Sequence, residues 1–192
     1  MKRILPLAFI LALLASFFRN DIGGYLKKIS QTEIEEAEIV SVIDGDTITV
    51  NLLAGDQPKI KTVRLLEIDA PESVHPDAKR NTKYGRLASE HLKEKLKKGD
   101  VVYLTADQTD KDRYGRILRL VWLERPKDPY NNQELRSECL NAILLSEGYA
   151  QVWISEGGAY SFLFSQLQME AEKSGKGLWG KGWLGRFKND ER

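Results

Sequence analysis

The chain has 192 residues, and several residue types that define whole classes of protein are scarce in it. Cys139 is the only cysteine, so no intramolecular disulfide can form. One cysteine with His75 and His91 gives no standard ligand spacing for a zinc cluster. We therefore expect Cys139 to be a small buried side chain in a helix, and His91 to lie on a helix face rather than to bind metal.

An excess of charge of either sign is also missing. The 29 basic residues nearly balance the 28 acidic ones, and the first 20 residues hold Lys2, Arg3 and Arg19 but no acid. The rest of the chain is therefore slightly acidic, and nucleic-acid binding would have to come from a local cluster of cations. A hydrophobic content of 42% with 30% charged residues is typical of a folded globular protein.

Long uncharged runs are absent except at the N-terminus. Residues 4–18 carry no charge and follow a basic start, which is typical of a secretory signal and short for a bilayer span of roughly 17–25 residues. No clear small-x-small cleavage site is present. We expect residues 1–19 to be a signal peptide or an N-terminal membrane anchor. The body would then be exported: secreted, periplasmic, or anchored to the outer face of the cytoplasmic membrane.

The remaining sequence predicts one domain over residues 37–183, after a polar connector at 20–36 and before a polar tail at 184–192. Helical spacing of apolar residues runs from Tyr84 to Leu96, from Leu135 to Gly148 and from Tyr160 to Ala171. Five β-rich runs are separated by turn signals: EIVSVI, TITVNLLA, IKTVRLLEI, VVYLTA and RILRLVWLE. Short strands with a helix between the third and fourth predict a small closed OB-type barrel, whose faces and loops often bind nucleic acid.

Three short segments hold residue types that phosphodiester hydrolysis requires. In VIDGDT, an Asp-Gly turn places carboxylates at the junction of two strands. In VRLLEIDAPES, Arg64 lies in an apolar strand, Asp69 closes it, and Pro71 stiffens the segment after that strand. In TDKDRYGRILRL, arginines precede a strand. Each segment alone is compatible with an ordinary turn whose charges face solvent.

Taken together, the three segments favour catalysis. Asp46 and Asp69 could hold one hard cation, because calcium prefers carboxylate and carbonyl oxygens. Arg64 and Arg116 could each bind phosphate oxygens through their guanidinium groups. Glu72 could orient or deprotonate a water molecule. An anionic substrate that gains charge on attack needs such cations and fixed donors.

The ordered set VIDGDT, VRLLEIDAPE, HP, KYG and DRYGR resembles the thermonuclease family, also called staphylococcal nuclease-like. The resemblance extends from about Ile39 to Trp179 and includes the ending SGKGLWG. It implies a five-stranded OB-fold barrel with three α-helices, which agrees with the strand pattern. It also implies a calcium-dependent endonuclease that hydrolyses DNA and RNA and leaves 3′-phosphate ends.

The resemblance also implies individual roles, carried over by position. Metal ligands fall on Asp46, Asp69 and the backbone carbonyl of Ala70. Catalytic residues fall on Arg64, Arg116 and Glu72, the last acting as general base or ordering the water. The resemblance further implies nucleotide contacts and supporting residues near the metal: Arg113, Tyr114, Asp44 and Thr47.

Departures from the family pattern concern the loops at 109–114 and 125–133, which are longer, and Glu67, which replaces an apolar residue. These differences bear on substrate preference more than on the reaction. Two alternatives are a catalytically silent OB module that binds nucleic acid or protein, and a membrane-tethered scaffold. The five charged site positions are all present, which favours the enzyme. No protein partner is implied, and we expect a monomer.

Overall fold

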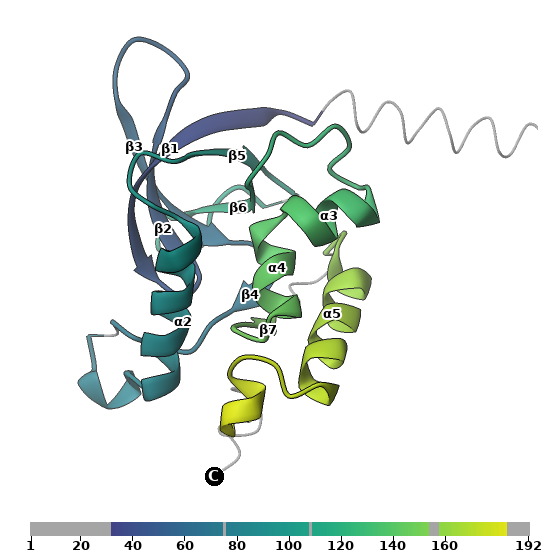
Figure 1. Ribbon diagram of the computed structural model, residues 1–192. Helices are drawn as coiled ribbons and strands as arrows, with labels where there is room; N and C mark the ends of the chain where they lie inside the picture. The colour runs from purple at the N-terminus through teal and green to yellow at the C-terminus, as the bar shows by residue number, and fades with distance from the viewer. Residues whose placement is uncertain (1–31, 75, 108, 154–157, 184–192) are drawn as a thin grey trace, which may run out of the picture. The chain divides into compact units, whose positions relative to one another are not determined.

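The computed structural model describes residues 32–74, 76–107, 109–153 and 158–183 (Figure 1). The predicted signal or anchor segment, most of the connector and the C-terminal tail lie outside these ranges. Within them, no helix combines the length and the apolar character that a membrane crossing needs.

Five strands close into a barrel in the order β1-β2-β3-β6-β5, which confirms the predicted architecture. Neighbouring strands are antiparallel except β3 and β6, which pair in parallel and complete the closure. The strands are β1 (Ile34–Asp44), β2 (Thr47–Leu52), β3 (Lys59–Leu65), β5 (Val101–Thr105) and β6 (Ile117–Trp122). Alternate side chains point inward and form the core, among them Ile39, Ile48, Val50, Val63, Leu65, Leu104 and Leu120.

The first strand begins at Ile34, before the predicted start of the domain at Ala37. The extra residues pair with β5, with Ile34 opposite Thr105. The last residues of the predicted connector therefore belong to the barrel.

Helix α2 (Lys83–Lys95) packs against β1. Thr82 caps its N-terminus, because the Thr82 hydroxyl oxygen accepts a hydrogen bond of 3.0 Å from the Gly85 backbone N–H. His91 lies on this helix as predicted, with its ring stacked 3.7 Å from that of Tyr149.

The helix predicted from Leu135 to Gly148 is two helices, α3 (Asn132–Glu138) and α4 (Leu140–Ser146). Cys139 separates them because its backbone is extended (φ −84°, ψ 113°) and forms a bridge with Trp122 of β6. The described ranges therefore contain four α-helices, counting α5 (Ser161–Lys173), where the sequence predicts three. Cys139 is buried as expected, and burial raises the pKa of its thiol to about 12.

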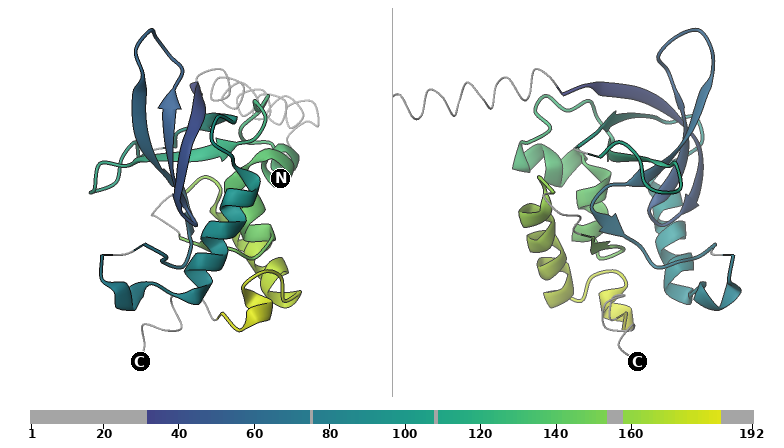
Figure 2. Two further views of the ribbon diagram at one scale, coloured as in Figure 1. Left: turned by 60° about the vertical axis from the view of Figure 1, so that its left-hand side comes forward. Right: turned by 180° about the vertical axis from the view of Figure 1, so that it is seen from behind.

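The run predicted as a strand up to Ile68 is interrupted after Leu65. Glu67 adopts a left-handed backbone (φ 57°), which turns the chain out of the barrel. The next two residues form β4 (Ile68–Asp69), which pairs antiparallel with β7 (Gln151–Val152). Figure 1 shows this small pair between α2 and α5, and Figure 2 shows the same ribbon from two further sides. Asp69 is the second residue of β4 and therefore lies outside the barrel strands. Two 3₁₀ turns complete the fold, η1 (Ala78–Arg80) and η2 (Trp179–Lys181).

Candidate active site

The turn between β1 and β2 is Asp44-Gly45-Asp46, and both carboxylates are buried. Gly45 is required for space: a Cβ there would lie 2.7 Å from the Cβ of Ala70 and 2.8 Å from that of Ala88. The turn is therefore pressed against the segment after β4 and against α2, which fixes the position of both aspartates.

Asp46 and Asp69 converge on one nitrogen of Arg64. The Nη2 atom lies 3.1 Å from Asp46 Oδ2 and 3.2 Å from Asp69 Oδ1. The strand register explains this, because Arg64 on β3 lies directly opposite Thr47 on β2, next to Asp46. The two carboxylates are therefore within about two hydrogen-bond lengths of each other.

Further donors fix each of these groups. Asp46 Oδ1 accepts from the Thr47 hydroxyl at 2.9 Å, and Oδ2 accepts from the Ala70 backbone N–H at 2.7 Å. Arg64 Nη1 donates to the carbonyl oxygens of Leu65 at 2.9 Å and Ile68 at 2.7 Å. The turn from β3 into β4 thus wraps around the guanidinium group and holds it rigidly.

Asp44 connects the turn to the segment that carries Glu72. Its Oδ1 accepts from the Gly45 N–H at 2.7 Å and from the Ser73 hydroxyl at 2.6 Å. Burial raises the pKa of Asp44, against the opposing effect of these hydrogen bonds. Asp44 therefore supports the site by anchoring the residue next to Glu72.

The backbone of Glu72 is also fixed from α2. Its carbonyl oxygen accepts from the Thr82 N–H at 3.0 Å. Gly85 packs so closely against this carbonyl that a Cβ would overlap it, which explains the glycine in KYG. Glu72 therefore projects its half-buried side chain from a stiff segment three residues after Asp69.

Arg116 joins the same group through Thr47. Its Nη1 lies 3.5 Å from Thr47 Oγ1, and its Nε donates to Asp112 Oδ2 at 2.7 Å. Asp112 Oδ1 also accepts from the N–H groups of Tyr114 at 2.9 Å and Arg116 at 3.0 Å. Partial burial raises the pKa of Asp112, but the hydrogen bonds from Arg116 outweigh it and lower the pKa below its usual value.

An exposed aromatic ring lies beside Arg116. The Tyr114 side chain is 69% exposed. The guanidinium carbons of Arg113 and Arg116 lie 4.8 and 5.6 Å from the ring centre. Arg113 Nη2 also donates to the Tyr114 hydroxyl at 2.7 Å. This arrangement offers a flat surface with positive charge at its edge.

Sequence reasoning missed two residues of this network, Asp112 and Gln151. Asp112 could have been found, since an aspartate two residues before a turn commonly accepts backbone N–H groups. Gln151 gave no signal, because it lies in a two-residue strand. Its Nε2 donates to Asp69 Oδ2 at 3.1 Å.

The donor set suits a hard divalent cation. Asp46 and Asp69 supply buried carboxylate oxygens, the ligand type that such ions prefer. The described residues contain no cluster of three His, Cys, Asp or Glu side chains suited to a metal. Backbone and water oxygens would therefore have to complete the coordination.

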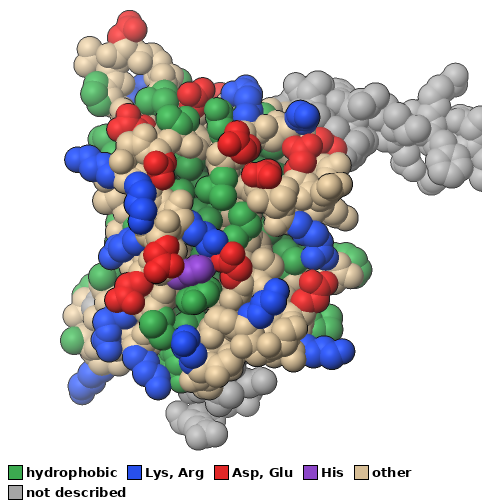
Figure 3. Space-filling model, viewed as in Figure 1, with side chains coloured by type: hydrophobic (Ala, Val, Ile, Leu, Met, Phe, Trp, Pro, Cys, Tyr) green, Lys and Arg blue, Asp and Glu red, His purple; other side chains and the backbone are tan. Residues whose placement is uncertain are grey.

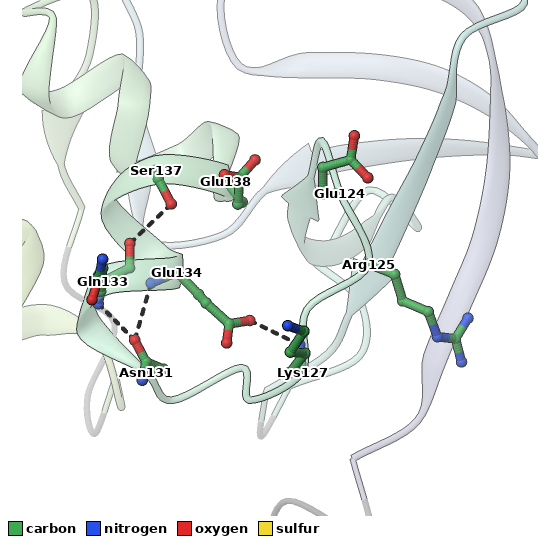
Figure 4. Close-up of a pocket in the computed structure, with 8 residues that line it drawn as sticks. All are labelled: Glu124, Arg125, Lys127, Asn131, Gln133, Glu134, Ser137 and Glu138. Atoms are coloured by element: carbon green, nitrogen blue, oxygen red, sulfur yellow. Dashed lines mark hydrogen bonds between the residues drawn. The ribbon is translucent and has the colours of Figure 1, made fainter.

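A second polar region lies between α3 and the loop that joins β6 to α3 (Figure 4). It is an open hollow of about 360 Å³, lined by Glu124, Arg125, Lys127, Asn131, Gln133, Glu134, Ser137 and Glu138. Glu134 Oε2 accepts from the backbone N–H of Lys127 at 2.8 Å, which accounts for its orientation. On the face of the molecule shown in Figure 3, acidic and basic side chains are interspersed, and neither sign of charge forms a large patch.

Comparison with known proteins identifies the family. Residues 62–181 match the family model described as staphylococcal nuclease homologue. The thermonuclease of Staphylococcus intermedius is 32% identical over 177 residues, which cover 92% of this chain and 95% of that protein. The Staphylococcus hyicus thermonuclease is 30% identical, with coverages of 92% and 94%.

A third relative is the micrococcal nuclease of Shigella flexneri, which is 30% identical over 142 residues, or 74% of this chain and 72% of that protein. The barrel, the paired aspartates around Arg64 and these matches together lead to one conclusion. The chain belongs to the staphylococcal nuclease family.

Proposed function

We propose that the protein is a calcium-dependent endonuclease that hydrolyses DNA and RNA and leaves 3′-phosphate ends. The observation that carries the proposal is the contact of Asp46 and Asp69 with the same nitrogen of Arg64. Arg116 is connected to this group through Thr47. The relatives are named as nucleases, which supports a nucleic-acid substrate.

Asp46, Asp69 and the Ala70 carbonyl would hold the calcium ion. When bound, the ion would supply positive charge that stabilises a phosphoryl oxygen as it becomes more negative. Arg64 lies beside both carboxylates, so its guanidinium would be within reach of a phosphate bound to the same ion.

Arg116 would stabilise the charge that develops on the phosphate or on the departing oxygen. Glu72 would orient the attacking water or accept its proton. Tyr114 would stack on a base, with Arg113 close enough to contact the neighbouring phosphate.

The proposal extends to where the protein works and in what form. Residues 1–19 would direct export, as a cleaved signal or as an anchor that keeps the enzyme at the outer face of the membrane. The protein would act as a monomer, since one chain supplies the whole set of proposed site residues.

The first test is cleavage of single-stranded DNA by the purified full-length chain, with calcium and with excess chelator. We expect cleavage that requires calcium and falls at least 100-fold in Glu72→Gln, the scale on which a general base acts. Glu134→Gln is the matched control, because this glutamate lies in the hollow on α3 and should leave the rate unchanged. A folded protein that binds DNA and cleaves nothing with any divalent metal would instead be the silent binding module.

Product ends test the position of the cut. Breaking the 5′ P–O bond leaves a 5′-hydroxyl, which polynucleotide kinase labels without prior phosphatase treatment. Products that accept label only after phosphatase treatment would carry 5′-phosphates and would contradict the proposed cut.

A further inference from the structure

Gln151 lies directly opposite Asp69 in the β4–β7 pair. Directly opposed residues of an antiparallel pair place their side chains on the same face. Gln151 is 2% exposed, and its Nε2 lies 3.1 Å from Asp69 Oδ2. A buried amide therefore contacts one of the two proposed aspartate ligands from the side of the helices.

The two oxygens of the Asp69 carboxylate accept hydrogen bonds from different strands. Oδ1 accepts from Arg64 on β3, and Oδ2 accepts from Gln151 on β7. Rotation of the carboxylate would break one of these bonds, so its orientation is held from two separate segments. An amide donor adds no charge, which leaves the negative charge that attracts a cation undiminished.

The position of Gln151 is itself fixed by two helices. Helix α4 ends at Ser146, and the chain then turns at Gly148 (φ 78°), where a Cβ would overlap the carbonyl of Lys176. From the other side, the Val152 N–H donates to Oε1 of Gln168 on α5 at 2.6 Å. Strand β7 is thus held in place before any metal binds.

We propose that Gln151 is a positioning residue that orients Asp69 for the metal ion, an inference that rests on the proposed function. Residues that hydrogen-bond a metal ligand typically contribute 10- to 100-fold to metal affinity. Removing the Gln151 donor should therefore weaken calcium binding by about tenfold or more while the barrel remains folded.

The test is calorimetric titration of the full-length chain with calcium, measured independently of cleavage. The variants are Gln151→Met, which keeps the length of the side chain without its donor, and Gln151→Ala, which adds no bulk. Gln133→Met is the matched control, because Gln133 is exposed on α3 and lines the separate hollow of that helix. We expect a raised calcium dissociation constant in both Gln151 variants, with the Gln133→Met value near that of the wild type.

Wild-type protein gives a second readout that needs no variant to fold. The side-chain amide NMR signals of Gln151 should shift on calcium addition, and those of Gln168 should remain in place. This measurement decides the matter if both Gln151 variants unfold.

The outcomes separate the two proposals. If the wild type binds calcium and the Gln151 variants bind it equally well, the role of Gln151 alone is overturned. The same follows if Gln133→Met weakens binding as much as the Gln151 variants do. The role of Gln151 is also overturned if the wild type binds calcium and the Gln151 side-chain amide signals do not shift. A folded wild type that binds no calcium overturns the proposed metal dependence and the role of Gln151 with it.

Discussion

Asp46 and Glu67 are both buried acidic residues, but their surroundings differ. Asp46 is 7% exposed and accepts hydrogen bonds from Thr47 and Ala70 in addition to its contact with Arg64. Glu67 is 4% exposed, yet within the described ranges its Oε2 has no hydrogen-bond partner, and Oε1 accepts a long 3.5 Å bond from the Tyr160 N–H. Burial raises the pKa of Glu67.

The comparison teaches that burial of a carboxylate does not by itself make a site. Asp46 and Asp69 each accept hydrogen bonds on both carboxylate oxygens and contact the Arg64 guanidinium, so each oxygen that loses water gains a partner. Glu67 has much less compensation and is best accommodated with a proton. Three variants test this contrast, and their expected effects decrease in the order given below.

Arg116→Ala should have the largest effect. Arg116 belongs to the network around Asp46, where the buried carboxylates have hydrogen-bond partners. We expect a loss in kcat/KM on single-stranded DNA of about 100- to 1000-fold, as for other donors that stabilise transition-state charge. The melting temperature should change little, because the Arg116 side chain is 31% exposed. A variant with near-wild-type turnover would remove Arg116 from the mechanism.

Asp112→Asn should have an intermediate effect. The amide oxygen can still accept the backbone N–H groups of the turn, but the charge that holds Arg116 Nε is lost. We expect kcat/KM to fall about tenfold through misplacement of Arg116. Asp128→Asn is the matched control, since Asp128 accepts from the Tyr130 N–H in a comparable turn outside the site. Equal losses in both variants would point to general loosening of loops.

Glu67→Gln should have the smallest effect, on stability rather than on catalysis. A raised pKa means that Glu67 favours folding at low pH, and that this contribution is lost as pH rises above its ordinary value of 4.5. Glutamine cannot ionise, so the variant should gain stability relative to the wild type with rising pH. At neutral pH the gain should be about 1 kcal/mol, the lower range for an unpaired buried group.

Urea unfolding at pH 4 and pH 8 measures this difference. If the two proteins lose or gain stability in parallel between these pH values, Glu67 titrates as it does in the unfolded chain. The contrast with Asp46 would then fail.

Local patterns were enough to predict the barrel. Alternating apolar residues and the Asp44-Gly45 turn specify strands and a hairpin within a few residues of each other. The break at Cys139 could not be read in this way, since it depends on a bridge to Trp122 in a distant strand. The turn at Glu67 also escaped prediction, because nothing in its neighbours requires a left-handed residue.

The site was predictable to the extent that its residues lie in recognisable motifs. Asp46, Arg64, Asp69 and Arg116 were expected to lie together, and contacts join them in one network. Their catalytic and metal-binding roles, and that of Glu72, stay predictions until cleavage is measured. Gln151 was out of reach, because its contact with Asp69 joins residues 82 positions apart through a two-residue strand pair.

That strand pair also determines how much of the chain must be synthesised before the network is complete. The network draws on residues 46, 64, 69, 116 and 151, and β7 is held in turn by Gln168 on α5. Domains generally fold as units during synthesis. A nascent chain that ends before α5 already contains all five barrel strands, the last of which ends at Trp122, but it lacks the helix that holds β7 and Gln151 in place.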